Sequence, residues 1–463
     1  MLEQLTFDDC SHSRDPIVGC ALEGVATIIA GIEGASIVIH SPQGCAATVA
    51  LGYDNHEIDF TQRKVACTRL FETDIILGAG QKLKDLIAEA DATFQSKVLF
   101  VVGTCSADII GEDIDGICRT MQAKTNARLI PIMAGGFRGN SYDGMDLGLK
   151  TLLPFIKQPD EVTKIPRSVN LVAPQASLNP TWWSDMHWVE RMLNAMGATV
   201  QATLPRHTTM HQLRHASTAS ANLLLSHDVG TPFMAQMAER HETPQLLADL
   251  PLPIGLKNTA RWLRALGEHF DAQEIAEKMI AEGEAMVVDV LRRRALMIIP
   301  RYRNCRVAIC ADATIGIGLV RLLFEELEMI PELLLFRSDS PKARSLLQQE
   351  LDSMGIAPKV AFNVDGYQIK KALSEHKVDA VLGSAWETYL AEELEIQLAF
   401  DVLSPTNRDV YVDRPYFGYD GMLNVLERIG NDWESAFRSK EIRWDHYDET
   451  RRPVNNDKER WAS

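Results

Sequence analysis

Residues 97–108 read KVLFVVGTCSAD, and this stretch decides the fold class. It begins with an unbroken apolar run that ends at Gly103, which is typical of a strand buried on both faces of a parallel sheet. The small polar residues that follow end the strand and open a helix, so the stretch has the strand, turn and helix order of an α/β unit. Cys105 lies at that turn, where parallel sheets usually bind their ligands.

The same order of elements returns along the chain in three segments. Apolar, β-rich runs alternate with amphipathic helical stretches, which predicts an α/β protein with three Rossmann-like, doubly wound parallel-sheet domains. The predicted strands are 35–40 and 97–103, then 168–173 and 221–226, then 305–310, 332–336, 359–362 and 378–383. The predicted helices include 80–90, 183–196 and 318–329.

Length and two breaks in periodicity predict the domain boundaries. A chain of 463 residues exceeds what one hydrophobic core usually supports. Prolines and charges in residues 158–167, and the RRR and PRYR sequences in 292–304, interrupt the helical pattern. We therefore expect a first domain over 1–160, a second over 165–295, a third over 300–409, and residues 410–463 packing near the first domain or on a partner.

Composition indicates a folded protein and excludes two classes of partner. The chain is 46% hydrophobic and 24% charged, as ordinary globular proteins are. Its formal charge of −16 argues against nucleic acid, because that binding depends on Lys and Arg neutralising phosphates. No apolar run reaches membrane-spanning length, and residues 1–16 lack the basic and apolar regions of a secretory signal. We expect a cytoplasmic protein.

The cysteines are clustered near the N-terminus. They occupy positions 10, 20, 45, 67, 105, 118, 305 and 310. In a reducing compartment such clustering indicates metal ligation or redox chemistry before structural disulfides. The alternative for any single cysteine is a small buried hydrophobic side chain. We favour that alternative for Cys10, Cys67, Cys118, Cys305 and Cys310, although one of the first three would be placed to assist a cluster.

Three cysteines share a setting that suits an iron–sulfur cluster. Each lies at the start of a predicted helix among small residues, in DPIVGCA (15–21), HSPQGCA (40–46) and VGTCSAD (102–108). Gly19 and Gly44 directly precede two of these cysteines and let the backbone approach a bulky cluster. Free N–H groups at a helix start stabilise thiolates. The wide spacing differs from the CxxC pairs of zinc ribbons and bacterial ferredoxins, and spacing by itself leaves three unrelated buried thiols as an alternative.

Several motifs together resemble the nitrogenase component 1 family. In the family's order they are HSPQGCA (40–46), FETDIILGAGQKLKDLI (71–87), VVGTCSADIIGEDIDG (101–116), LPLPIGLKNT (250–259) and RPYFGYDG (414–421). The resemblance implies three Rossmann-like domains in each of two homologous subunits. It also implies an iron–sulfur cluster at the subunit interface, held by three cysteines from each N-terminal domain. Carried over by motif, these ligands are Cys20, Cys45 and Cys105.

Two positions differ from the family's α-type subunits. Those subunits bind a catalytic iron–sulfur cofactor through a Cys in the second domain and a His shortly before the PYxGY element. Residues 223–228 (LLLSHD) contain no cysteine here, and residues 407–413 (NRDVYVD) contain no histidine. The resemblance therefore implies a β-type subunit without catalytic residues of its own.

The resemblance also implies an electron path and partners. An α2β2 heterotetramer would receive electrons from an ATP-dependent homodimeric [4Fe-4S] reductase through an interfacial [8Fe-7S] P-type cluster. Substrate would be reduced in the α-type partner, with methylthio-alkanes (by C–S bond reduction) or dinitrogen as the expected substrates. The alternatives are a tetrapyrrole reductase of the protochlorophyllide type, with a shared [4Fe-4S] cluster, and a non-catalytic scaffold for cofactor assembly.

The remaining candidate residues have structural explanations. His40 ends a predicted strand, where we expect a backbone carbonyl to satisfy its ring. His227 and Asp228 resemble a general-base pair, but no nucleophile or metal ligand accompanies them. The sequence IGIG at 315–318 lacks the full GxGxxG spacing, so it predicts close helix-to-strand packing rather than a dinucleotide site.

Overall fold

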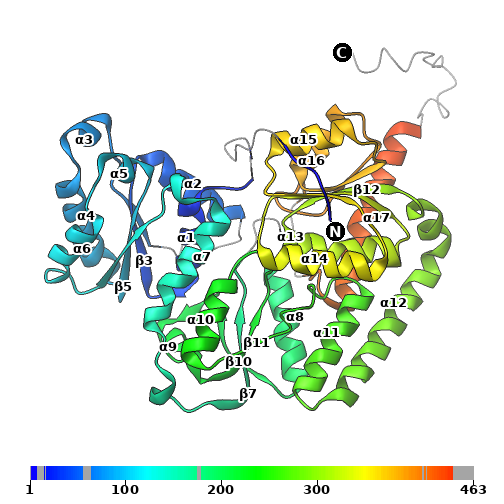
Figure 1. The fold of residues 1–463 in the computed structure, drawn as a ribbon, viewed down its shortest axis with the longest axis horizontal. Coiled ribbons are helices and arrows are strands. Elements are labelled where there is room, and N and C mark those ends of the chain that lie inside the picture. Colours follow the sequence, from blue (N-terminus) through cyan, green and yellow to red (C-terminus); the bar gives the residue numbers. More distant parts are fainter. Residues whose placement is uncertain are drawn as a thin grey trace.

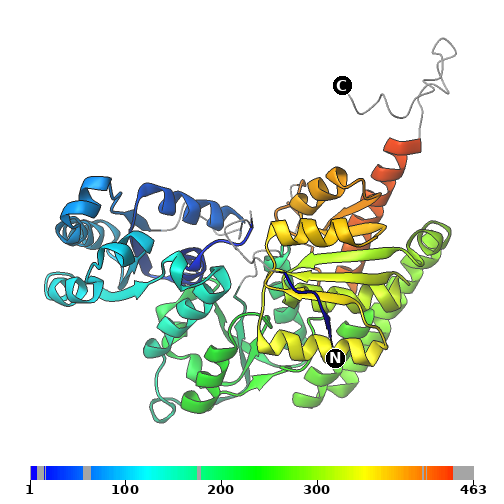
Figure 2. The ribbon, with the colours of Figure 1, turned by 45° about the horizontal axis from the view of Figure 1, so that its top comes forward.

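The computed structural model describes residues 2–7, 15, 17–55, 64–174, 179–408, 411–412 and 414–441. Within them the chain forms three parallel sheets of four or more strands, each flanked by helices (Figure 1). The turned view in Figure 2 shows the first and third domains as two lobes, with the second below and between them. Among the described residues, no helix is both long and apolar enough to cross a membrane.

The first sheet has the strand order β4-β3-β5-β6 and is buried on both faces. Ile37 and Ile39 pack on the side of α1 and α7, whereas Val38 packs on the side of α4 and α6, so the strand reads as an unbroken apolar run. The strands are β3 (Ala35–His40), β4 (Val65–Cys67), β5 (Val98–Gly103) and β6 (Arg128–Met133). The helices are α1 (Ala21–Ala30), α2 (Gln43–Asn55), α3 (Glu72–Leu77), α4 (Gly80–Phe94), α5 (Cys105–Ile110), α6 (Ile114–Gln122) and α7 (Ser141–Leu152).

The second sheet has the order β11-β10-β7-β8 and lies below the first in Figure 1. Its strands are β7 (Ile165–Val172), β8 (Thr199–Leu204), β10 (Ala219–Leu224) and β11 (Gln245–Leu246). The short strands β2 (Ile32–Glu33) and β9 (Thr208–Thr209) pair between the first two domains. The helices are α8 (Trp182–Ala195), α9 (Met210–Arg214), α10 (Thr231–His241), α11 (Leu256–His269) and α12 (Gln273–Tyr302).

The third sheet has the order β1-β14-β13-β12-β15-β16. Its strands are β1 (Glu3–Gln4), β12 (Arg306–Ala311), β13 (Ile330–Phe336), β14 (Lys359–Phe362), β15 (Ala380–Gly383) and β16 (Leu398–Asp401). The helices are α13 (Ala313–Arg321), α14 (Pro341–Met354), α15 (Gly366–Glu375), α16 (Ala385–Glu393) and α17 (Gly418–Glu441). Short helical turns are η3 (Gly136–Arg138), η4 (Leu153–Phe155), η5 (Pro159–Glu161), η6 (Ala216–Thr218) and the π-helical η7 (Leu322–Glu326).

The predicted fold class is confirmed, while some element positions differ from the prediction. The helix predicted at 318–329 begins at Ala313, because the Asp312 side chain caps it by accepting from the Ile315 N–H. It then passes into the π turn η7. The predicted break at 292–304 lies largely within α12, which continues to Tyr302. The domain boundaries themselves stay a prediction.

The two ends of the described chain lie with the third domain. β1 pairs with β14, although residues 1–160 were expected to form the first domain. α17 packs against β16, α11 and α12, whereas residues 410–463 were expected near the first domain or on a partner. The reason is an apolar face on α17: Val425 and Ile429 are buried in the core of the third domain, and the Trp433 ring meets the Tyr302 ring edge-on. Residues 442–463 lie outside the described part of the chain.

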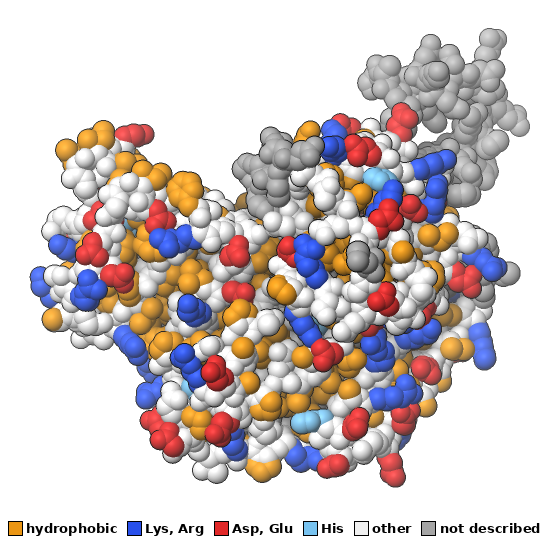
Figure 3. All heavy atoms as spheres, viewed as in Figure 1, with side chains coloured by type: hydrophobic (Ala, Val, Ile, Leu, Met, Phe, Trp, Pro, Cys, Tyr) orange, Lys and Arg blue, Asp and Glu red, His pale blue; other side chains and the backbone are white. Residues whose placement is uncertain are grey.

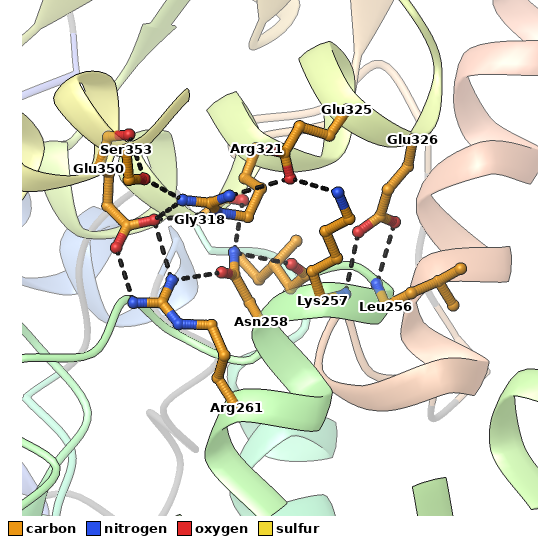
Figure 4. Close-up of polar contacts among 11 residues, drawn as sticks. Leu256, Lys257, Asn258, Arg261, Gly318, Arg321, Glu325, Glu326, Glu350 and Ser353 are labelled. Carbon is orange, nitrogen blue, oxygen red and sulfur yellow. Dashed lines mark hydrogen bonds and ion pairs between the residues drawn. The ribbon is translucent and has the colours of Figure 1, made fainter. Parts of the chain in front are cut away.

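The LPLPIGLKNT motif forms the joint between α11 and the third domain, shown in Figure 4. The Glu326 carboxylate accepts hydrogen bonds from the backbone N–H groups of Leu256 (2.9 Å) and Lys257 (3.1 Å) at the start of α11. The Asn258 amide donates to the Gly318 carbonyl on α13 (3.3 Å). Arg261 and Arg321 converge on the Glu350 carboxylate. The motif is therefore accounted for by helix capping and ion pairing.

Candidate metal centre

Cys20, Cys45 and Cys105 lie at the carboxyl edge of the first sheet, on three loops that meet there. Cys20 directly precedes α1 and forms an isolated bridge with Asn140, at the start of α7. Cys45 lies in the first turn of α2, in the connection that follows β3. Cys105 is the first residue of α5, after β5. All three thiols are free and half-buried.

A glycine loop after β6 brings two of these cysteines together. The Gly136 N–H donates to the Cys105 sulfur (2.9 Å). A Cβ atom at Gly136 would lie 3.5 Å from both the Cys105 Sγ and the Cys20 Cβ. Asp108 and Arg138 form an ion pair (2.8 Å) that ties this loop to α5. Gly136 was not predicted as part of the site, and its sequence signal is the Gly-Gly pair one residue after the end of β6.

The predicted glycines at the site have different surroundings. A Cβ atom at Gly44 would meet no atom within 4 Å, so the loop before Cys45 has open space beside it. A Cβ atom at Gly19 would come within 1.8 Å of a carboxylate oxygen of Glu23, which lies on the chain's own α1. Open space at Gly44 fits the prediction that a bulky group approaches there, whereas packing against Glu23 accounts for Gly19.

The electrostatics of Cys45 show that the sulfur atoms are near one another. Burial raises the pKa of the Cys45 thiol, and the neighbouring Cys20 and Cys105 raise it further. A hydrogen bond with Ser41 opposes this rise. In the metal-free protein this thiol is therefore protonated at neutral pH, so binding of a metal cluster must release its proton.

Cys67 is a fourth half-buried cysteine at this edge, not the core residue that was expected. It ends β4, and its Sγ lies 3.5 Å from the Ser41 Oγ and accepts from the Arg69 N–H (3.4 Å). The other described cysteines, Cys118, Cys305 and Cys310, are buried, as predicted. Cys10 lies outside the described residues.

The segment before Cys20 is anchored to the third domain by a buried ion pair. One Asp15 oxygen accepts from the backbone N–H groups of Ile17 (2.8 Å) and Val18 (3.1 Å), and the other accepts from the Arg337 guanidinium (2.9 Å). Arg337 also donates to Glu387 (2.6 Å), and the three charged side chains are almost fully buried. Removing one member of such a group would leave an uncompensated buried charge, so each member is needed for the stability of this anchor.

His40 is buried at the end of β3, below the Cys45 loop. Its predicted bond to a backbone carbonyl is wrong, because neither ring nitrogen has a hydrogen-bond partner, and Nε2 lies 3.8 Å from the Glu112 carboxylate. Burial lowers the pKa of His40, while Glu112 acts in the opposite direction. The ring is therefore neutral at neutral pH. We assign it no chemical role.

The residues at the α-type cofactor positions have structural roles here. The Asp228 carboxylate accepts from the N–H (2.8 Å) and hydroxyl (2.5 Å) of Thr314, at the start of α13. Burial lowers the pKa of His227 to about 4, and Ser340 donates to its backbone carbonyl (2.6 Å). Both residues join the second and third domains, so the expectation that they are not a general-base pair agrees with the geometry. The second cofactor position of the α-type subunits corresponds to residues 407–413, of which 409, 410 and 413 lie outside the described residues.

The donor set at this edge consists of thiols. Within the described ranges, no three His, Cys, Asp or Glu side chains approach closely enough to hold one metal ion. Cys20 and Cys105 are near enough to Cys45 to raise the pKa of its thiol. Their partial exposure leaves the site open on one side.

Exposed apolar side chains lie on the loops and helices next to this edge. They are Phe71, Ile76 and Leu77 at α3, Ile109 on α5 and Phe137 in η3. Figure 3 shows hydrophobic side chains gathered at the tip of the first domain, over α3. Large exposed apolar patches on soluble proteins mark interaction surfaces. These five residues form the apolar surface, which lies next to the cysteine edge and is of the kind that binds another protein.

Three parallel α/β domains with thiols at one sheet edge define the class of three-domain α/β oxidoreductase subunits. Residues 20–434 match the family model described as nitrogenase component 1 type oxidoreductase, and the chain belongs to that family.

Curated relatives and a solved structure agree with this family. The chain is 25% identical over 458 residues to the nitrogenase molybdenum-iron protein beta chain of Methanococcus maripaludis, covering 90% of this chain and 93% of the relative. It is also 25% identical over 420 residues to the nitrogenase iron-molybdenum cofactor biosynthesis protein NifE of Methanococcus maripaludis, covering 89% and 82%. The structure of nitrogenase Cp1 at pH 6.5 superposes with a TM-score of 0.76 at 17% identity, covering 96% of this chain and 97% of that one. The predicted family, β-type likeness and fold are confirmed.

Proposed function

We propose that this chain is the β-type subunit of a nitrogenase-like reductase and shares an interfacial iron–sulfur cluster with a homologous α-type subunit. Cys20, Cys45 and Cys105 are its ligands in this chain. The observation that carries the proposal is the convergence of three free, half-buried thiols at one sheet edge, two of them on either side of Gly136.

The residues around the cysteines hold the ligands in place and stabilise their charge. A P-type [8Fe-7S] cluster, when bound, supplies a relay for electrons from an ATP-dependent [4Fe-4S] reductase to the cofactor of the partner. The Gly136 N–H donates to the Cys105 sulfur, which favours the thiolate that iron requires. The Asp15–Arg337 pair fixes the segment that leads to Cys20.

The apolar surface supports the proposed partners. Ile76 and Leu77 are 79% and 84% exposed, which is unusual for aliphatic side chains without a partner. A homologous α-type subunit would cover the cysteine edge, giving an α2β2 heterotetramer. The reductase homodimer would dock over the same end of the first domain.

The substrate belongs to the partner. Residues 223–228 are committed to the contact between the second and third domains, and no cysteine in them is available for a cofactor. Reduction of methylthio-alkanes or of dinitrogen therefore takes place in the α-type subunit. A tetrapyrrole reductase with a [4Fe-4S] cluster is the alternative enzyme.

A cofactor-assembly scaffold is the second candidate function. The similarity to NifE, a cofactor biosynthesis protein, favours it. The reductase and the scaffold need the same fold and the same cysteine edge, so the structure does not distinguish them. Substrate turnover does, because only the reductase converts a substrate.

Turnover by the anaerobically co-purified complex tests the proposed function. The complex is supplied with the reductase, ATP and either a methyl thioether or dinitrogen, and hydrocarbon or ammonia is measured. We expect ATP-dependent product formation that is lost in Cys105→Ala. Cys118→Ala is the control and should keep the activity, because the Cys118 thiol lies in the hydrophobic core between the sheet and the helices α4 and α6. An iron-replete complex that forms neither product would contradict reduction of these two substrates and favour the scaffold or the tetrapyrrole reductase.

A further inference from the structure

A basic cavity of about 590 Å³ lies at the end of the first sheet opposite the cysteines. Lys97 directly precedes β5 and Arg128 begins β6, so both lie at the amino ends of strands whose carboxyl ends carry the site described above. The facing wall comes from α9 of the second domain, at the lower left of Figure 1. The ionisable side chains that line the cavity are Lys97, Arg128, Lys157, His211, Arg214 and His215.

The positive charge of this cavity is not neutralised within the described chain. No Asp or Glu of the described residues lines it. Nor does any of its four Lys and Arg side chains form an ion pair with a described carboxylate, although the whole chain carries a formal charge of −16. Like charges gathered in one concave site repel one another, and a bound anion relieves that repulsion.

Lys157 is held in position by a short hydrogen-bonded chain. Its Nζ lies 3.0 Å from the His215 Nε2, and because an ammonium group only donates, that ring nitrogen accepts. His215 Nδ1 must then carry the proton, which it donates to the His211 carbonyl (2.9 Å). The Lys157 backbone is fixed as well, since its N–H donates to the Arg214 carbonyl (3.0 Å). The ammonium group is therefore preorganised at the cavity wall.

Arg128 is positioned by an aromatic ring. Its guanidinium carbon lies 4.8 Å from the centroid of the Phe155 ring, which also lines the cavity. Stacking of this kind holds the guanidinium plane while its N–H groups stay available for an oxyanion. Arg128 and Lys157 are thus two cations of the cavity that are held by contacts other than ion pairs.

We propose that this cavity binds a small polyanion with two or more phosphate or carboxylate groups. Several fixed cations around a concave site suit closely spaced oxyanions, and charge-assisted hydrogen bonds supply the affinity. The site is separate from the cysteine edge, so the proposal does not depend on the function proposed above. A ligand there would link the first domain to α9.

Calorimetric titration of the purified complex with inorganic pyrophosphate and with citrate tests the proposal. We expect saturable binding of one or both probes, weakening with added chloride because salt screens the cations. Arg128→Gln and Arg214→Gln each should raise the Kd at least about tenfold, since each removes a charged donor. Both side chains are exposed, so neither change disturbs the core. Binding of pyrophosphate alone identifies a phosphoryl ligand, and binding of citrate alone identifies a polycarboxylate.

A matched control separates this cavity from general surface charge. Lys278→Gln removes a cation of α12 that is 75% exposed and lies outside the cavity. It should leave the Kd unchanged, and the iron content should be the same in all variants. Absence of binding with both probes, or equal weakening in Lys278→Gln and Arg128→Gln, would overturn the proposal.

Discussion

The described cysteines fall into two chemical groups. Burial raises the pKa of Cys118 and of Cys305 to about 12 and raises that of Cys310 as well, so these thiols stay protonated and unreactive. Cys20, Cys45, Cys67 and Cys105 are half-buried at one edge of the first sheet. The difference in burial alone therefore separates the cysteines of the edge from those of the core, without comparison with any related protein.

Alkylation should therefore distinguish the two groups. In iron-free protein, iodoacetamide should label the four cysteines of the edge, while Cys118, Cys305 and Cys310 become labelled only after denaturation. Reconstitution with iron and sulfide should protect Cys20, Cys45 and Cys105. Peptide mass spectrometry gives the labelled fraction at each position, and equal labelling of edge and core cysteines would contradict the assignment.

Gly44 offers a test of the space beside Cys45. A Cβ atom there meets nothing within 4 Å in the chain itself, so Gly44→Ala should leave the thermal unfolding of the iron-free protein unchanged or slightly raise its midpoint. If a cluster approaches this backbone as predicted, the methyl group should lower the bound iron. Full iron content in Gly44→Ala would show that no cluster approaches the backbone at Gly44.

At the scale of single elements, α13 begins beside two buried carboxyl groups. Asp312 caps the helix, and Asp228 accepts from Thr314, two residues later in the first turn. Burial and the Asp228 carboxylate raise the pKa of Asp312 to about 8. The unfolded value is near 4, so between these two pH values the folded state holds a proton that the unfolded state has lost. The contribution of Asp312 to stability therefore falls as the pH rises through that window.

Asp312→Asn should remove this part of the pH dependence. The amide oxygen can still accept from the Ile315 N–H, so the cap remains. Relative to wild type, the free energy of unfolding of the variant should rise between pH 5 and 8, by at most about 1.4 kcal/mol per pH unit. Denaturant unfolding across this range measures it. Asp113→Asn, at the exposed cap of α6, is the control, and the same pH profile in both variants would refute the explanation.

The start of α11 depends on one carboxylate from the π turn. Glu326 accepts from two backbone N–H groups there (Figure 4). Glu326→Ala should lower the free energy of unfolding by about 1–2 kcal/mol, because it removes the acceptor of two N–H groups at the helix start, one partly buried and one exposed. Glu393→Ala, which removes only an exposed pair with Lys370, should cost less than about 1 kcal/mol. If both variants lose the same free energy of unfolding, the Glu326 cap stabilises the protein no more than an exposed ion pair does.

Sequence predicted elements well where apolar pattern and burial coincide. The strands at Ala35–His40 and Val98–Gly103 are such cases, because both faces are buried and the runs are unbroken. It failed at α12, where Arg and Pro suggested a break but the helix continues, and at α13, whose cap lies upstream of the apolar pattern. Cys20, Cys45 and Cys105 are candidate ligands from their local sequence together with the family resemblance. Gly136 and Ser41 contact cysteines of this edge through loops whose approach one sequence does not reveal.

At the scale of the whole molecule, the cysteine edge is linked to a distant domain and to an outward-facing surface. The Asp15–Arg337 pair connects the segment before Cys20 to the end of β13 in the third domain. The apolar surface around α3 faces away from the chain's own core. The proposed metal centre is thus tied to the third domain of its own chain by a buried ion pair, while the apolar surface beside it is exposed.

Iron and sulfide content of the anaerobically co-purified complex, compared between wild type, Cys45→Ala and Cys118→Ala, tests the central claim most directly. The account predicts about eight irons per subunit interface in wild type and in Cys118→Ala, with loss of iron and a changed EPR signal in Cys45→Ala. About four irons would indicate the tetrapyrrole-reductase alternative. Unchanged iron in Cys45→Ala would contradict the assignment of this edge as the metal centre.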